Sequence, residues 1–533
     1  MTAQPFSNPL DSVSGPSTQW TRVNVGEAFP GVVTPLHYDF AVRAGELGIR
    51  GAYHERGVLT SEEAAEPDVA DERVMAAFRG RLAVNVDAMR RFGDRVSNTA
   101  ADDIELSLLG QVRPDAPRNP TSDRHAVIAQ CEPAVRENIE RRALDLSDKV
   151  AALWRMSTSP DALADVEGAP ARWQEAYDEF REGAIVITHV TTFAGEAFGA
   201  VMQACGSVGK PELLARINGG YGDTHDDEMS EALWNLAHGL ISLADFLSEY
   251  GYQGHRAADL AATVWREDPR PLEPTVAALA ALPDDEAPHV NRVERVRDRI
   301  AGEHELLDAL TGPERDAAAA AVADLRRFTA LRERVKAVSQ RSLDIARGAA
   351  RTLGTELAER GLLDDREDVF YLLAAEFVTG TATDLRERAA YRKGLGRDYE
   401  RVDIPVMFVG NPQPMPLEQH GAEPAPAIQG LGVSPGVVEG RCRVIVDPAT
   451  AEPLVAGEIL VCSTTDPSWV GHFLLASALV IDVGGPMSHG AIVARELGVP
   501  CVINTGSGTT QLRSGDEIRV DGSSGAVEVL RAI

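Results

Sequence analysis

The sequence predicts a multidomain protein in which a mainly α-helical region precedes a small α/β domain of β/β/α type. Its 533 residues exceed what one hydrophobic core usually organises. Apolar residues recur at helical spacing up to about residue 405, whereas short β-branched runs follow after residue 428. We therefore expect a flexible N-terminus (1–19), a helical domain (20–410), a proline-rich linker (411–428) and an α/β domain (429–533).

Helices are expected wherever apolar residues fall three and four positions apart. Three of the four clearest stretches begin with proline, which suits a first helical position because its missing N–H would be unpaired there. Gly361 suits a cap after the last stretch, which is long enough to form one extended helix. The four stretches are 133–154, 170–182, 229–250 and 313–360.

The linker and the strands are expected from local composition. Five prolines between Gly410 and Ala427 exclude a packed helix and favour extended backbone. Glycine, aspartate and serine separate the β-branched runs that follow, as in strands joined by turns. These runs are 437–438, 443–446, 459–462, 478–481, 501–503, 517–520 and 527–530.

Charge and composition exclude several classes of protein. With 81 acidic and 52 basic residues, the net charge of −29 would repel nucleic acid and anionic membranes. The N-terminus lacks the basic and apolar pattern of a signal peptide, and no run of eighteen apolar residues predicts a membrane span, so we expect a cytoplasmic protein. The five cysteines form no metal or redox pattern, so buried free thiols and no metal site are expected.

The most informative motif lies between Asp482 and Ile503. A strand ending at Ile481 leads into Gly484 and Gly485, and Ser488-His489 then opens a helix. His489 should lie in the first turn, where unpaired N–H groups and the helix dipole stabilise a phosphate. The glycines allow close approach of the backbone, and the Ser488 hydroxyl can cap the helix or bind a phosphoryl oxygen. Because neutral imidazole is nucleophilic, His489 is a candidate phosphoryl carrier; the alternative is an ordinary helix-start histidine.

This motif resembles the swivelling phosphohistidine domain of the PEP-utilising enzymes, which include phosphoenolpyruvate synthase, pyruvate phosphate dikinase and rifampin phosphotransferase. Residues 431–440, 465–469 and 520–527 extend the resemblance over most of 429–533, and the middle run contributes Thr465 and Asp466. It implies that His489 takes a phosphoryl group from ATP at one site and delivers it at another, with the linker allowing the swing. The matching motif positions are Gly484, Gly485, Ser488, His489, Ala491, Ala494, Arg495, Gly498, Pro500 and Val502.

The helical region is similar to the acceptor-binding middle domain of the rifampin-phosphotransferase-like branch. Runs at 24–36, 80–85, 265–269 and 368–372 carry this likeness. Arg332 and Lys336 are four residues apart on one helix face, and their spacing alone favours a solvated charged face. The resemblance implies instead that they hold the transferring phosphoryl group.

The chain departs from the family at the Tyr-Gly-His-Arg-Gly motif. It has Tyr252 and Gln253 at the usual His and Arg positions, with His255 and Arg256 just after them. Either the later pair replaces the motif through a shifted turn, or the acceptor chemistry uses other groups. The base for the acceptor proton is therefore unassigned, and His255 is a candidate.

No glycine-rich phosphate loop occurs in the sequence. The resemblance then implies that a separate ATP-grasp subunit binds ATP and Mg²⁺ and charges His489 with the β-phosphoryl group. The chain looks like the histidine-bearing subunit of a split phenol or cresol phosphate synthase, forming aryl phosphate, AMP and inorganic phosphate. The alternatives are a non-catalytic regulator or scaffold, and an antibiotic- or PEP-linked phosphotransferase; for the PEP-linked enzyme, the expected (β/α)₈ barrel pattern is missing.

Overall fold

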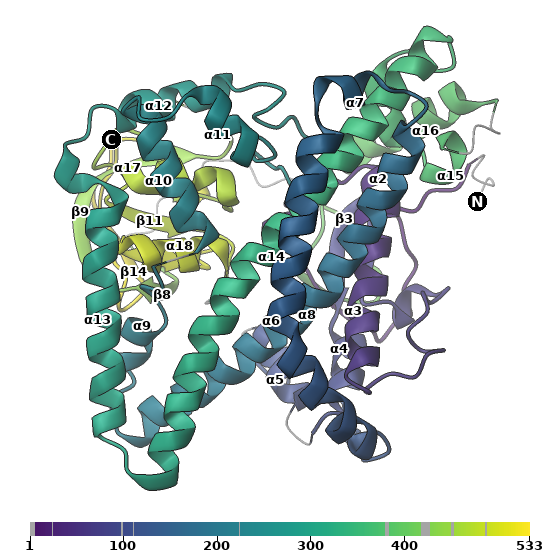
Figure 1. The fold of residues 1–533 in the computed structure, drawn as a ribbon. Helices are drawn as coiled ribbons and strands as arrows, with labels where there is room; N and C mark the ends of the chain where they lie inside the picture. Colours follow the sequence, from purple (N-terminus) through teal and green to yellow (C-terminus); the bar gives the residue numbers. More distant parts are fainter. Residues whose placement is uncertain are drawn as a thin grey trace. The chain divides into compact units, whose positions relative to one another are not determined.

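The computed structural model describes residues 6–23, 25–97, 100–109, 111–222, 224–378, 383–416, 427–448, 452–485 and 488–533. The chain forms two compact units, each assembled from three stretches of sequence (Figure 1). The expected helical domain is divided between them, because residues 190–257 and 263–334 belong with the C-terminal residues. Unit 1 comprises Met1–His189, Ala258–Ala262 and Val335–Leu417, and unit 2 comprises Val190–Ala257, Thr263–Arg334 and Glu418–Ile533.

Unit 1 is helical but also contains a four-stranded sheet of order β2-β3-β1-β5, which the helical periodicity did not predict. Its hairpin turns at Arg79-Gly80, where both residues have positive φ. The elements are β1 (Gln19–Thr21), α1 (Val25–Ala28), α2 (Pro35–His37), α3 (Arg43–Glu55), β2 (Met75–Phe78), β3 (Arg81–Asn85), α4 (Val86–Gly93), α5 (Ala100–Leu109), α6 (His125–Ser157), α7 (Pro160–Ala164), α15 (Ala374–Phe377), α16 (Leu385–Tyr399), β4 (Val402–Asp403), β5 (Met407–Val409) and β6 (Met415–Pro416).

The N-terminal stretch differs from the expected flexible lead-in within the residues that the structure describes. Leu10 is buried in an apolar cluster, and the Trp20 indole N–H donates to the Ser14 hydroxyl at 2.9 Å. The Ser14 hydroxyl in turn donates to Asp71 at 2.6 Å. Isolated anchors of this kind leave no period in the sequence, so composition alone does not reveal them.

The long helices agree only partly with the predicted stretches. α14 (Gly312–Glu359) confirms the long helix to within one residue at each end. α6 instead begins eight residues before Pro133, which therefore lies inside the helix, and α8 (Ala169–Ser207) continues far beyond residue 182. The stretch 229–250 is two helices, because Ser242 and Asp245 form a capping box that starts a new one.

Among the described helices, α8 is long and apolar enough to cross a membrane by length and composition. Its most apolar eighteen-residue window has a mean hydropathy of 1.4, and 39% of that window is buried. Core helices of soluble proteins meet the same criterion, so α8 is weak support for a membrane span.

Unit 2 contains an eight-stranded mixed sheet of order β7-β14-β13-β9-β10-β11-β12-β8. The four strands from β9 to β12 are parallel, and the flanking pairs are antiparallel. The predicted runs 437–438 and 443–446 join in one strand, β9. The elements are β7 (Ala427–Gln429), β8 (Leu431–Ser434), β9 (Val437–Ile445), β10 (Ile459–Cys462), α17 (Val470–Leu475), β11 (Ala478–Ile481), α18 (His489–Leu497), β12 (Cys501–Ile503), α19 (Gly508–Gln511), β13 (Glu517–Asp521) and β14 (Ala526–Arg531).

We call residues 427–533 the α/β segment, and residues 190–257 with 263–334 the helical segment of unit 2. The predicted linker 411–428 lies largely outside the described residues, which resume at β7. The helical segment consists of the C-terminal part of α8, α9 (Leu213–Ile217), α10 (His225–Ala237), α11 (Leu243–Tyr250), α12 (Glu273–Leu279), α13 (Pro288–Asp308) and the N-terminal part of α14.

The two segments of unit 2 share one hydrophobic core. Trp469 and Phe473 of the α/β segment pack in the same buried cluster as Met229, Leu233 and Phe246 of the helical segment. Figure 1 shows α13 beside α18. Burial of this shared apolar surface is the main stabilising contribution to their association.

Four of the five free cysteines are buried: Cys205, Cys442, Cys462 and Cys501. Burial raises the pKa of Cys442 to about 12, so its thiol stays protonated at neutral pH. The prediction of buried free thiols is confirmed for these four, whereas Cys131 is half-buried.

Candidate functional site

The predicted strand–glycine–helix motif forms α18 and the turn before it. β11 ends at Ile481, the Ser488 hydroxyl caps α18 by accepting the Ala491 N–H at 3.4 Å, and Gly498 ends the helix at φ 71°. Close packing favours glycine at position 490, because a Cβ there would lie 2.6 Å from Ile481 and 2.9 Å from the Thr465 hydroxyl. Gly484 lies against Ser488, while Pro486 and Met487 fall outside the described residues.

His489 is held between the two segments of unit 2. Its Nδ1 is 3.4 Å from the Thr465 hydroxyl, and its Nε2 is 3.6 Å from the Asp226 carboxylate on α10. The Phe473 ring stacks on the imidazole with centroids 6.0 Å apart. The Thr465 hydroxyl can accept a proton from Nδ1 or donate one to it, so either ring nitrogen can carry the proton. Nδ1 of His489 thus faces Thr465 within the α/β segment, whereas Nε2 faces Asp226 in the helical segment.

Arg495 and Arg332 lie in the same unit and influence each other electrostatically. Burial, together with the nearby Arg332 charge, lowers the pKa of Arg495, whose guanidinium donates to the Val433 carbonyl at 3.5 Å. Arg332 is 4.0 Å from the Glu333 carboxylate. Lys336 is one turn further along α14, in the part of that helix that belongs to unit 1. Two of the predicted cations therefore belong to the unit that contains His489.

His255 contacts two aspartates of the α/β segment. Its ring nitrogens lie 3.8 Å from Asp447 and 3.9 Å from Asp466. Asp466 also accepts the Arg256 backbone N–H at 3.0 Å and caps a short helix through Ser468. His255 therefore links the helical segment to the α/β segment. Its role as the base for the acceptor proton stays a prediction.

Tyr252 and Gln253 occupy fully buried positions. The Tyr252 hydroxyl lies 2.6 Å from His225 Nε2, and His225 Nδ1 is 3.5 Å from Glu228. An imidazole therefore reaches the motif from α10, although the motif's own histidine is replaced by tyrosine. Sequence reasoning missed His225 because 27 positions separate it from its partner.

Glu496 of α18 contacts the loop 218–222. The sequence analysis did not predict this residue as part of the site. The Glu496 carboxylate accepts the Tyr221 backbone N–H at 3.1 Å, and a Cβ at Gly219 would lie 3.2 Å from Arg495. Burial and the Asp227 charge raise the pKa of Glu496 to about 8, so this carboxyl is mostly protonated at pH 7.

Raising the pH is expected to weaken unit 2 through Glu496. Its pKa in the folded protein, about 8, exceeds the value of 4.5 for an unperturbed glutamate, so the stabilisation is complete below pH 4.5 and is lost as the pH rises through 8. The loss is on the order of 5 kcal/mol at most. Hydrogen exchange of α18 and of residues 218–222, measured at pH 6 and pH 9, should show this drop, and Glu496→Gln should remove most of it.

Glu528→Gln is the matched control, because Glu528 lies exposed on β14. It should keep the wild-type pH dependence. An unchanged pH response in Glu496→Gln would assign the effect to other groups.

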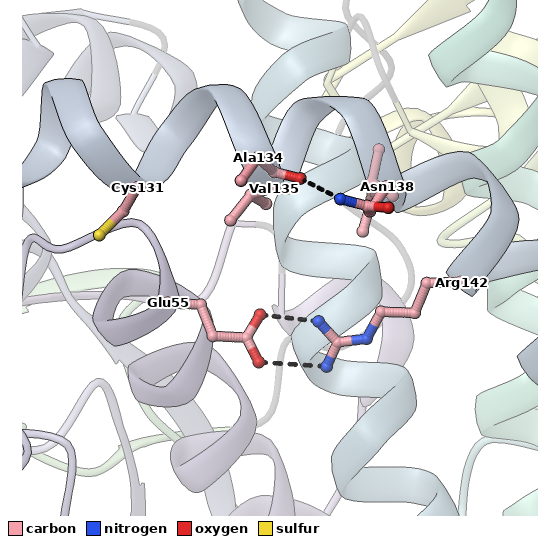
Figure 2. A pocket seen from close by; sticks show the side chains of 7 residues that line it. Glu55, Cys131, Ala134, Val135, Asn138 and Arg142 are labelled. Atoms are coloured by element: carbon pink, nitrogen blue, oxygen red, sulfur yellow. Dashed lines mark hydrogen bonds and ion pairs between the residues drawn. The ribbon is translucent and has the colours of Figure 1, made fainter.

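Unit 1 contains a cavity, which Figure 2 shows from close by. It has a volume of about 390 Å³ between α3 and α6. Its charges are paired: despite burial, hydrogen bonds from His189 and Arg142 lower the pKa of Glu55 to about 2. Its lining residues are Glu55, Cys131, Ala134, Val135, Asn138, Ile139 and Arg142.

Within the described ranges, no group of three or more His, Cys, Asp or Glu side chains has the arrangement of a metal site. The ring nitrogens of His489 lie near the Thr465 hydroxyl and the Asp226 carboxylate.

Comparison with known proteins finds one family match in each segment of unit 2. Residues 454–525 match the mobile domain of the PEP-utilising enzymes, and residues 239–333 match the fourth domain of rifampicin phosphotransferase. The first match contains the strand–glycine–helix motif with His489, and the second contains Tyr252, His255 and Arg332.

Individual relatives show the same similarity. The rifampicin phosphotransferase of Bacillus subtilis is 32% identical over 296 residues, which cover 54% of this chain and 34% of that protein. A rifampicin phosphotransferase of a Streptomyces species is 35% identical over 332 residues, covering 60% and 38%. An uncharacterized phosphotransferase of Bacillus subtilis is 34% identical over 190 residues, covering 33% and 23%. The chain thus spans about a third of the length of the rifampicin phosphotransferases that it matches, and it is similar to them over that part.

Proposed function

We propose that this protein is a phosphotransferase component in which His489 Nε2 carries a phosphoryl group from ATP to a hydroxyl acceptor. The single observation that carries the proposal is the placement of His489, in the first turn of α18 with its Nδ1 against Thr465 and its Nε2 directed at the helical segment. The similarity of both segments to rifampicin phosphotransferases supports it.

Thr465 supports Nε2 as the reacting atom. When Nδ1 carries the ring proton and donates it to the Thr465 oxygen, the ring is held in place and the Nε2 lone pair can attack phosphorus. The first turn of α18 offers unpaired backbone N–H groups, and Arg332 and Arg495 supply positive charge in the same unit.

We propose an ATP-grasp subunit as the donor, binding ATP and Mg²⁺ and passing on the β-phosphoryl group. The similarity of this chain to rifampicin phosphotransferases supports a donor that uses ATP. For the acceptor we propose a phenol such as phenol or 4-cresol, which would yield aryl phosphate, AMP and inorganic phosphate. A phenol ionises near pH 10 in water, and nearby guanidinium groups lower that value, so a phenol needs less help from a base than an alcohol does.

Incubation with the ATP-binding subunit and ATP labelled at the β-phosphorus tests the proposal. Acid-labile, base-stable label is expected on this chain, and addition of phenol or 4-cresol should release it as aryl phosphate. ATP labelled at the γ-phosphorus is the control and should leave the chain unlabelled. Absence of β-label with a demonstrably active partner would favour a regulatory or scaffold role.

A further inference from the structure

A carboxylate from outside the α/β segment faces the nitrogen that we assign as the phosphoryl carrier. Asp226 Oδ2 lies 3.6 Å from His489 Nε2, and both side chains are only 8% exposed. The neighbouring Asp227 forms the capping box of α10 with Thr224, which fixes the first turn of the helix. Asp226 is therefore presented to His489 by a rigid element.

We propose that Asp226 is the catalytic base that takes the proton from the acceptor hydroxyl, an inference that rests on the function proposed above. As the acceptor oxygen attacks phosphorus, the O–P bond forms and the N–P bond breaks, and the electron pair of the broken bond remains on Nε2. The acceptor proton moves to the Asp226 carboxylate. Nδ1 keeps its own proton, so the imidazole that leaves is neutral, and Asp226 then releases the acceptor proton to solvent.

The observed arrangement matches the end of this sequence. A 3.6 Å separation between Nε2 and Oδ2 leaves room for a proton but none for a phosphoryl group between them. The proton that Asp226 takes from the acceptor can lie between these two atoms once the phosphoryl group has left. When His489 is phosphorylated, the phosphoryl group adds negative charge beside Asp226, and this increases the affinity of the carboxylate for the acceptor proton.

Three other titratable groups of unit 2, His255, His225 and Glu496, contact other residues. His255 lies between Asp447 and Asp466, and His225 Nε2 contacts the Tyr252 hydroxyl. The Glu496 carboxylate accepts a backbone N–H from the loop 218–222. Asp226 is the carboxylate that the structure places against the reacting atom itself.

The test separates charging of His489 from discharge. The full chain is phosphorylated with potassium phosphoramidate, which needs no ATP-binding subunit. The phosphohistidine signal that remains in His489→Ala is subtracted from the signal of each protein. Loss of phosphohistidine is then followed by ³¹P NMR in buffer and after addition of phenol. Wild type, Asp226→Asn, Asp226→Glu and Glu228→Gln are compared, with circular dichroism as the check on folding.

We expect Asp226→Asn to charge as wild type does and to transfer to phenol about 100-fold more slowly or worse. Asp226→Glu should recover part of the rate because it restores a carboxylate. Glu228→Gln removes the same charge from the same helical turn and should behave as wild type. A merely structural role for Asp226 predicts instead that asparagine, which has the same shape, supports full transfer.

Equal rates of discharge in Asp226→Asn and wild type would overturn the inference and leave the proposed function standing. If phenol does not accelerate discharge, water is the acceptor and the same comparison of rates decides. Failure of wild-type His489 to accept any phosphoryl group would overturn the proposed function and the inference together.

Discussion

Replacing His489 by alanine is expected to reduce acid-labile phosphorylation by the ATP-binding subunit to background. The methyl group offers no nucleophile, and the first-turn N–H groups of α18 cannot hold a phosphoryl group covalently. The fold should persist, because the Ser488 cap and the Gly498 end of α18 do not involve the imidazole. Acid-labile label, measured after rapid mixing, is the readout.

His472→Ala is the matched control for that experiment. His472 belongs to the same α/β segment and lies against Trp469. Burial and the His255 charge lower its pKa to about 4, so it is a neutral imidazole at pH 7. It should retain full labelling. Label that persists in His489→Ala but disappears in His472→Ala would move the carrier to His472.

Replacing Asp482 by alanine is expected to destabilise the α/β segment by about 3–5 kcal/mol. This buried carboxylate accepts the Thr505 hydroxyl at 2.6 Å, the backbone N–H groups of Gly508 and Thr509, and the Thr509 hydroxyl. Alanine leaves these donors buried without an acceptor. Urea unfolding, with hydrogen exchange of residues 478–485 and 505–511, should show the loss.

Loss of Asp482 should also reduce phosphorylation, because it directly precedes the turn that contains Gly484 and Gly485. Asp521→Ala is the control: its carboxylate accepts N–H groups of Ser523 and Ser524 in an exposed turn, where water can replace it. It should unfold as wild type does. Equal stability of Asp482→Ala and wild type would mean that water or a rearranged hydroxyl satisfies the donors.

Local signals explain what the sequence could predict. α18 begins at a serine cap and ends at a left-handed glycine, both of which are readable within ten residues. The β-branched runs between 459 and 530 were likewise recognisable from their own composition and the turn residues beside them. The hairpin around Gly80 was missed because its strands are only four and five residues long and lie within a helical region.

Contacts between distant parts of the chain could not be predicted. Glu496 and Tyr221 are 275 positions apart, and no periodicity indicates that they meet. Asp226 looks like one more acidic residue in a first helical turn, where such residues are common. The division of the helices between two units likewise depends on which apolar faces pack together, and a single sequence records the faces without their partners.

The shared core of unit 2 determines how release of the α/β segment should respond to temperature. Separation would expose Trp469 and Phe473 together with Met229, Leu233 and Phe246. Exposure of apolar surface increases the heat capacity, and the attraction between such surfaces weakens on cooling. The fraction of molecules in which the α/β segment is separated from the helical segment should therefore increase on cooling. A protein that binds the separated segment would need an apolar surface to cover the exposed aromatic rings.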